Sequence, residues 1–138
     1  MQVQPYLSFE GRAEEAIEFY KKAVGAKVTM MMRNKESPEQ PPGMPPNSGD
    51  KIMHCAMTIG DSVVMATDGM MSGNPKFGGI SLTINADSDA EAKKLFNNLA
   101  EGGQVTMPLN KTFFASSFGM VADKFGVHWM LMAGPTNP

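Results

Sequence analysis

Hydrophobic and polar residues along this chain alternate with two different periods, and the period changes in a regular order. Residues 2–9 alternate every second position, as expected for a strand with one buried face. Residues 13–24 then carry an apolar stripe at helical spacing, and Gly25 follows as a helix stop. Residues 26–32 return to strand character. The chain is therefore predicted to begin with a strand, a helix and a second strand.

Two further strands complete this first half. Residues 52–59 and 62–67 read as strands joined by a tight hairpin at Gly60-Asp61. Residues 34–50 hold five of the ten prolines and are predicted to form a long surface loop, partly of polyproline II conformation.

The second half shows the same order of periods. Ser88 and Glu91 have the spacing of a helix capping box, and apolar residues at 92, 95, 96 and 99 form the stripe of the helix that follows. The strands expected around this helix are 80–85, 104–109, 118–122 and 127–132.

The similarity between the halves extends to individual residues. When residues 13–30 are placed over residues 90–107, eight positions are identical, whereas composition alone gives about one or two matches. One β-α-β-β-β unit cannot bury both faces of its sheet, so two units are expected to pack together. The predicted fold is α+β: a single domain over 1–138 with two units (about 1–70 and 78–134) side by side, a mixed sheet with a concave cleft, and helices on the outer face.

Composition narrows the function classes. The net charge is −2 with acids and bases interspersed, so the sequence offers no basic surface for nucleic acid or an anionic membrane. No apolar run approaches the roughly 20 residues of a membrane span, and the start shows no signal peptide pattern. Cys55 is the single cysteine, which favours a reduced, cytoplasmic location. The 14 methionines are compatible with either an ordinary core or an adaptable binding surface.

Three stretches carry a family resemblance: "PYLSFEGRAEEAIEFYKKAVGAKV", "MHCAMTIGDSVVMATD" and "FGMVADKFGVHWMLM". The chain resembles the PhnB-like branch of the vicinal oxygen chelate superfamily, which holds glyoxalase I, extradiol dioxygenases, and fosfomycin- and bleomycin-resistance proteins. The resemblance implies paired β-α-β-β-β units, a concave site and a homodimer. PhnB-like proteins often carry a demethylubiquinone methyltransferase name. The sequence has no Gly-rich strand-to-helix turn for an adenosyl cofactor, so that name weighs little here.

The resemblance also implies where a divalent metal would bind. Four positions in the first and last strands of each unit hold it in the superfamily, as His, Glu or Gln. Here they fall on Gln4 or Pro5, on or beside Met65, on Gly79 and on Met130. Only Gln4 offers a side-chain oxygen, and thioethers and glycine do not hold a hard or borderline cation. We therefore predict no metal and no other cofactor, unless the strand register differs.

The remaining candidates form a ligand-binding set rather than a catalytic one. His54 and His128 fit either a ligand-contacting or acid–base role or a purely structural one. Asp68 and Asp123 are interpreted as turn residues, and Cys55 as a buried inert thiol. We predict that the concave face carries Tyr6, Ser8, His54, Met65, Ser81, Thr83, Phe114, His128 and Met130.

Three functions compete at this point. The favoured one is a metal-independent protein that binds a small molecule, as the bleomycin-resistance proteins do. The alternative is a metal-dependent lyase, isomerase or dioxygenase of the same superfamily, with a different register or a site built on His54 and His128. The third is a structural or regulatory module without a ligand. The residues leave open whether the chain is an enzyme, and no catalytic residue is assigned.

Overall fold

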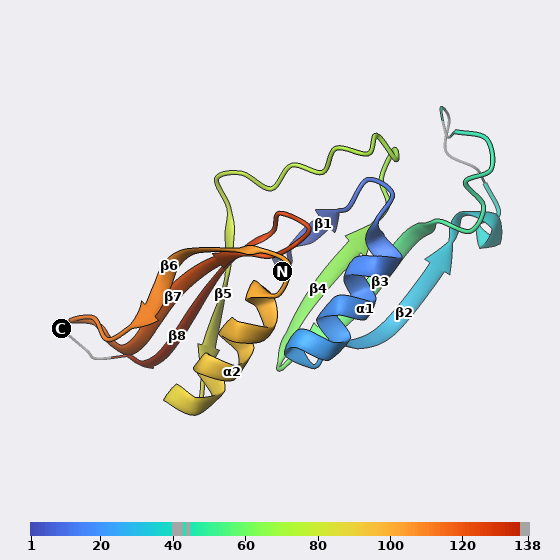
Figure 1. Cartoon of the computed structure of the whole chain (residues 1–138). Coiled ribbons are helices and arrows are strands. Elements are labelled where there is room, and N and C mark those ends of the chain that lie inside the picture. The colour runs from blue at the N-terminus through green and yellow to red at the C-terminus, as the bar shows by residue number, and fades with distance from the viewer. Residues whose placement is uncertain (40–42, 44, 136–138) are drawn as a thin grey trace. The chain divides into compact units, whose positions relative to one another are not determined.

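The computed structural model describes residues 1–39, 43 and 45–135 and divides into two compact units, Met1–Pro75 and Lys76–Pro138. Each unit contains one long helix and one four-stranded mixed sheet (Figure 1). The α+β fold built from two β-α-β-β-β units is thus confirmed. The packing of the two units side by side, the shared cleft and the single domain stay predictions.

Unit 1 has its strands in the order β1-β4-β3-β2, with β1 parallel to β4 and the other neighbours antiparallel. The helix α1 joins β1 to β2, and a short 3-10 helix, η1, follows β2. The elements are β1 (Tyr6–Ser8), α1 (Ala13–Val24), β2 (Lys27–Arg33), η1 (Asn34–Glu36), β3 (Ile52–Ile59) and β4 (Ser62–Thr67).

Unit 2 repeats this topology. Its strand order is β5-β8-β7-β6, with β5 parallel to β8 and the other neighbours antiparallel. The elements are β5 (Ser81–Ala86), α2 (Asp89–Ala100), β6 (Gln104–Asn110), β7 (Ala115–Ala122) and β8 (His128–Pro135).

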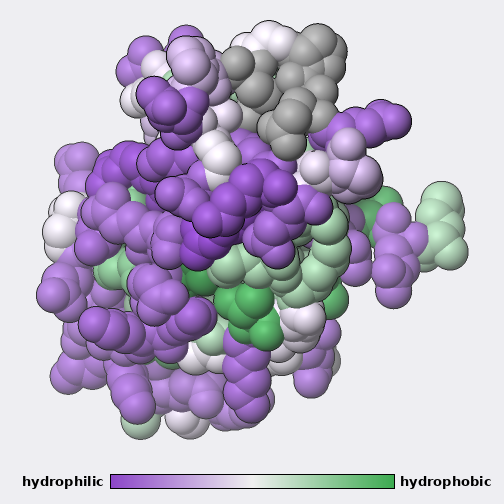
Figure 2. Space-filling model, turned by 90° about the vertical axis from the view of Figure 1, so that its right-hand side faces the viewer, coloured by the Kyte–Doolittle hydropathy of each residue, from purple (hydrophilic) through white to green (hydrophobic). Residues whose placement is uncertain are grey.

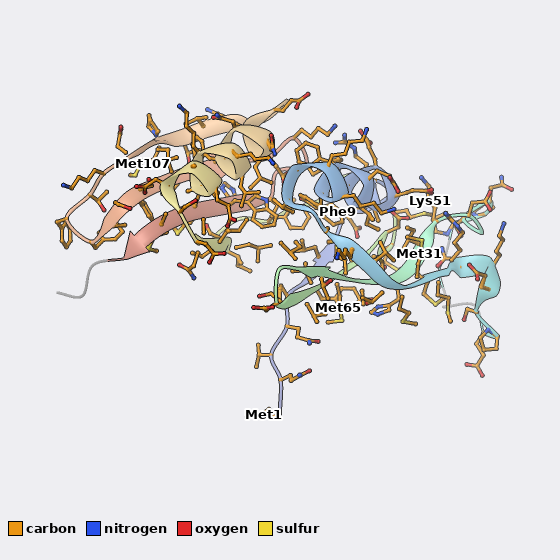
Figure 3. The ribbon with its side chains drawn as sticks, turned by 90° about the horizontal axis from the view of Figure 1, so that it is seen from below. Met1, Phe9, Met31, Lys51, Met65 and Met107 are labelled. Carbon is orange, nitrogen blue, oxygen red and sulfur yellow. The ribbon has the colours of Figure 1, made fainter. Side chains whose placement is uncertain are left out.

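Three predicted strands had bounds wrong by three residues or more: those at 2–9 and 118–122, and the one at 127–132, which is β8 and continues to Pro135. The strand expected at 2–9 is only Tyr6–Ser8, and Val3 is 95% exposed. Pro5 still accepts the Met65 N–H through its carbonyl but has no N–H to donate, so the ladder stops there. Met1 lies at the end of a tail that leaves the sheet (Figure 3). By contrast, β7 starts at Ala115, three residues before the predicted strand, because it pairs with the far end of β8.

The two helices follow the sequence signals closely. The stripe of α1 is buried, and Gly25 ends the helix in the left-handed conformation with φ of 69°. At α2, Ser88 Oγ accepts the Glu91 N–H at 3.1 Å, as the capping-box spacing predicts. The Glu91 carboxylate accepts instead from the Asp87 N–H, one residue earlier than in the standard box.

The internal repeat contains a one-residue slip. The buried residues Ala92 and Phe96 of α2 correspond to Ala16 and Tyr20 of α1 at a displacement of 76. The strands β2 and β6 correspond at a displacement of 77, and each has a register irregularity at its second residue pair. The extra residue lies at the end of α2, where Glu101 caps the helix and Gly102 takes the positive φ.

Each unit contains one buried carboxylate that connects segments by hydrogen bonds: Asp68 in unit 1 and Asp123 in unit 2. Asp68 accepts the N–H groups of Ala13 and Ile52, each at 2.7 Å, and so joins the start of α1 to the start of β3. Asp123 accepts from the backbone of the β7–β8 turn and from Trp129 Nε1 at 2.8 Å. The turn role predicted for Asp123 is confirmed, while Asp68 acts over a longer range than a turn residue.

Hydrogen bonds join the two ends of the proline-rich segment. The buried side chain of Asn34 donates to the Ser48 carbonyl at 2.9 Å, and the Asn34 N–H donates to Lys51. Residues 40–42 and 44 fall outside the described part of the chain, so the polyproline prediction is not tested there. Among the residues described, no helix is long and apolar enough to cross a membrane.

Candidate functional site

Each sheet has one face against its helix and one face turned away from it, which we call the open face. In unit 1, Leu7, Ala66 and Cys55 are register partners, and all three are buried on the helix side. The alternate residues Tyr6 and Met65 are also partners and lie on the open face. Figure 3 shows Phe9 close under α1 and Met65 on the opposite side of the sheet.

A hydrogen-bonded aromatic pair occupies the open face of unit 1. The Tyr6 hydroxyl lies 2.7 Å from Nδ1 of His54, and the two ring centroids are 5.3 Å apart at 65°. The two residues come from β1 and β3 and meet across β4. The predicted residues Tyr6, His54 and Met65 therefore share one surface, as the alternation indicated.

The protonation of Tyr6 is set by its surroundings. Partial burial raises the pKa of the Tyr6 hydroxyl, nearby Cys55 raises it further, and a hydrogen bond with Thr67 lowers it in part. The hydroxyl thus keeps its proton at neutral pH and can donate it to an unprotonated Nδ1. The pair can hold a polar group of a ligand by hydrogen bonding.

Ser8 lies on the same face, but its hydroxyl is already engaged. It donates to the Glu10 carboxylate, which also accepts from the Ser72 N–H and hydroxyl. These hydrogen bonds lower the pKa of Glu10, the Ser8 bond most. Gly69 permits the arrangement, because an added Cβ would clash with the Glu10 carboxylate and the Ser8 hydroxyl. The Ser8 hydroxyl therefore already donates to a carboxylate within the protein, and a ligand would have to compete with that hydrogen bond.

In unit 2 the predicted residues pair within the sheet. Ser81 is the register partner of His128, and Thr83 is the partner of Met130. Phe114 packs edge-on against Phe118, with ring centroids 5.0 Å apart. The nine predicted residues therefore form two groups, one on each open face, and each group is assembled within its own unit.

Several open-face residues escaped the sequence analysis. Met30 and Met32 pair with Ala56 and His54, so they share the open face of unit 1. The run Met30-Met31-Met32 shows no alternation, and an irregularity between Val28 and Met30 shifts the register, so no pattern could assign a face. In unit 2, the alternation of β7 and β8 places Phe118, Met120 and Met132 on the open face.

The edge of the unit-1 sheet adds apolar surface. Met30 on the edge strand β2 is 47% exposed. Figure 2 views the molecule from the side that carries β2 and shows an apolar patch within a mainly hydrophilic surface. Methionine side chains are flexible and polarizable, so Met30 and Met32 can adapt to ligands of different shape.

The four positions at which the resemblance places a metal do not form a donor set. Gln4 and Pro5 precede β1, and Gly79 precedes β5, while Met65 and Met130 lie within strands. The side-chain amide of Gln4 donates to Gln2. Within the described ranges, no three His, Cys, Asp or Glu side chains gather closely enough to hold a metal ion. Glycine, proline and thioether positions do not fit a hard divalent cation.

Cys55 fits no nucleophilic role. Its side chain is fully buried on the helix side of β3, and burial raises the pKa of the thiol. The thiolate that nucleophilic chemistry needs is therefore disfavoured. This agrees with the interpretation of Cys55 as an inert core residue.

Comparison with known proteins identifies relatives over the whole chain. A family model described as 3-demethylubiquinone-9 3-methyltransferase matches residues 1–132. Protein YjdN of Escherichia coli (strain K12) is 36% identical over 147 residues, which cover 100% of this chain and 99% of YjdN.

Several solved structures are also similar to this chain over nearly its whole length. Protein PA1353 from Pseudomonas aeruginosa is 42% identical with a TM-score of 0.84, covering 97% of this chain and 98% of that one. The Bacillus cereus PhnB protein, titled a putative 3-demethylubiquinone-9 3-methyltransferase, is 27% identical with a TM-score of 0.78, covering 97% and 100%. Fosfomycin resistance protein FosX from Mesorhizobium loti, 11% identical with a TM-score of 0.65 over 96% and 90%, shares the fold alone. The chain therefore belongs to the PhnB-like family whose model is described as 3-demethylubiquinone-9 3-methyltransferase, within the vicinal oxygen chelate fold.

Proposed function

We propose that this chain binds a small organic molecule on its open faces and needs no catalytic metal to do so. The observation that carries the proposal is the Tyr6–His54 pair on a methionine-rich sheet face. One hydrogen-bonded polar pair on an adaptable apolar surface is the composition expected of a small-molecule site. Of the positions for a metal, only Gln4 offers a side-chain oxygen, which supports binding without one.

The methyltransferase description of the family does not extend to this site. Methyl transfer requires a bound methyl donor, and the chain has no Gly-rich turn between a strand and a helix of the kind that holds a dinucleotide or adenosyl group. The open face of unit 1 carries a phenol, an imidazole, thioethers and the Ser8 hydroxyl, which suit recognition of a small molecule. We therefore favour binding over methyl transfer.

The first experiment measures metal content and thermal stability of the purified, untagged chain. Melting is recorded as purified, after EDTA, and with added Zn²⁺, Ni²⁺, Mn²⁺ or Fe²⁺. We expect less than stoichiometric metal and an unchanged melting temperature. Stoichiometric metal, with a lower melting temperature after EDTA, would overturn the proposal and favour a metal-dependent lyase, isomerase or dioxygenase.

The second experiment screens small molecules by the same melting assay. A ligand present at 100 times its Kd adds about 2.7 kcal/mol to the free energy of unfolding, which moves the melting temperature by several degrees. His54→Gln and Met65→Ala should reduce that shift, whereas Lys22→Gln on the exposed surface of α1 should not. A shift that all three variants preserve would place the ligand elsewhere.

A further inference from the structure

A groove opens on the other face of unit 2, between its helix and its edge strand. It has a volume of about 580 Å³, which is within the range of small-molecule sites. Its walls come from α2 and β6, and the start of β7 closes one end. The residues lining it are Asp89, Lys93, Phe96, Asn97, Val105, Pro108, Leu109, Asn110, Lys111, Ser116 and Ser117.

The groove has a polar end and an apolar end. Asp89 at the start of α2 accepts hydrogen bonds from Ser116 and Ser117, at 2.5 and 2.6 Å, which places the helix start beside the start of β7. The last residue of β6, Asn110, pairs with Phe118 of β7. Lys111 follows directly after Asn110, so it lies near Ser116 and Ser117 at the polar end of the groove. Further along, Phe96 and Val105 line an apolar stretch, where Val105 is 43% exposed.

The charges at the polar end favour an anion. Two lysines, Lys93 and Lys111, line the groove, and neither takes part in any ion pair seen within the described residues. Asp89 is the single acid in the lining, and the two serine hydroxyls lower its pKa by hydrogen bonding to the carboxylate. The formal balance of the lining is therefore two positive charges against one negative charge.

In unit 1, the corresponding space between the helix and the edge strand contains an ion pair. There, Glu14 on α1 and Arg33 at the end of β2 form a bidentate ion pair, with N···O distances of 2.9 and 3.1 Å. The helix displacement of 76 places Glu14 over Ala90, and the strand displacement of 77 places Arg33 over Asn110. Unit 2 thus has neutral residues at both equivalent positions, and the nearest charged residues of the groove lining are Asp89 and Lys111, each one residue away.

We infer that this groove is a second ligand site, for a small amphiphilic anion. Its carboxylate, or a similar acidic group, lies between Lys93 and Lys111 at the polar end of the groove. Its apolar body lies along Phe96, Val105 and Leu109. The inference is independent of the ligand proposed for the open faces, because the groove is on the helix side of the sheet.

The test uses octanoate and heptyltrimethylammonium, which share the same heptyl tail and carry opposite charges. Each is titrated into the full-length chain while backbone amide NMR signals are followed. We expect octanoate to shift the amides of Lys93, Val105 and Asn110, and the cation to bind at least about threefold more weakly. Equal binding of the two probes, or shifts confined to the open faces, would overturn the inference.

Two sets of variants locate the site. Lys93→Gln and Lys111→Gln should each weaken octanoate about three- to tenfold, whereas Lys94→Gln, a neighbouring lysine outside the groove, should leave it unchanged. The double variant Ala90→Glu, Asn110→Arg copies the ion pair of unit 1 and should abolish binding. Unchanged octanoate binding in the two lysine variants would refute the site even if the double variant failed to fold.

Discussion

At Asp68 a single buried carboxylate joins segments that are distant in the sequence. Its two oxygens accept hydrogen bonds from the backbone N–H groups of Ala13 and Ile52, and Asp68 is only 1% exposed to solvent. The sequence places Asp68 between a strand and Gly69, which indicates a turn, but it does not reveal either partner. A buried charge of this kind is tolerated only when hydrogen bonds replace its water.

We expect Asp68→Asn to destabilise the chain by about 2–4 kcal/mol, because the new amide nitrogen faces a backbone donor where an acceptor is needed. Urea unfolding measures the loss. Asp61→Asn in the exposed β3–β4 turn is the matched control and should change stability by less than about 0.5 kcal/mol. Similar losses in the two variants would contradict the structural role of Asp68.

Tyr6 gives a prediction in the alkaline range. Its folded pKa is raised by burial above the ordinary tyrosine value of 10.0, so the folded chain holds this proton more tightly than the unfolded chain. Stability from this group is therefore full below the ordinary value and falls as pH rises through the folded pKa. Absorbance titration of Tyr20→Phe, which leaves Tyr6 as the only tyrosine, should show the delayed ionisation.

Tyr6→Phe is the companion variant. It should show a smaller loss of stability between neutral pH and pH 11 than the parent chain, measured by urea unfolding at each pH. A titration midpoint for Tyr6 at the ordinary tyrosine value of 10.0, or an identical pH dependence of stability in the two chains, would show that the surroundings of Tyr6 do not raise its pKa.

At the scale of elements, close packing of α2 and β6 on β7 depends on Gly119. A Cβ added at this position would lie 2.8 Å from the Phe96 ring and 2.9 Å from Leu109 Cα. Such contacts are too short to be relieved without moving the helix or the edge strand. The position explains why β7 carries a glycine in the middle of an otherwise regular strand.

Gly119→Ala is expected to lower the free energy of unfolding by about 1–3 kcal/mol through overpacking. Gly78→Ala is its control, because a Cβ at Gly78 meets no atom within 4 Å. Thermal and urea unfolding of both variants test the difference. A neutral Gly119→Ala would mean that α2 and β6 shift readily at this contact.

The elements themselves were largely predictable from the two periods. Both helices, the Gly60-Asp61 hairpin and the strand β4 match the predicted bounds or differ by a residue or two. The errors came at strand ends, where pairing decides the length. β1 is short because Pro5 has no N–H to donate to β4, and β7 is long because β8 continues to Pro135.

At the scale of the whole molecule, the two units expose large apolar side chains. Phe113 is 92% exposed and Ile80 is 69% exposed. Isolated exposed residues are common, but large aromatic and aliphatic side chains are also typical of protein contacts. These residues are consistent with the homodimer that the family resemblance implies.

Sedimentation equilibrium should therefore give about 29.8 kDa, twice the chain mass of 14.9 kDa. Phe113→Ser and Ile80→Ser should move the equilibrium toward the monomer, while Lys76→Ala on a nearby exposed position should not. A single 14.9 kDa species at every concentration would rule out the dimer.

The sequence by itself determined the repeat, both helices, most strands and the parity of residues along each strand. These features follow from local periodicity and from backbone preferences, which each segment carries within itself. It therefore also assigned Tyr6, His54 and Met65 to one face. Which strands pair, and in which register, depends on partners far along the chain. Only the tertiary structure could therefore reveal the Tyr6–His54 hydrogen bond, the two partners of Asp68, and the groove beside α2 with its two lysines.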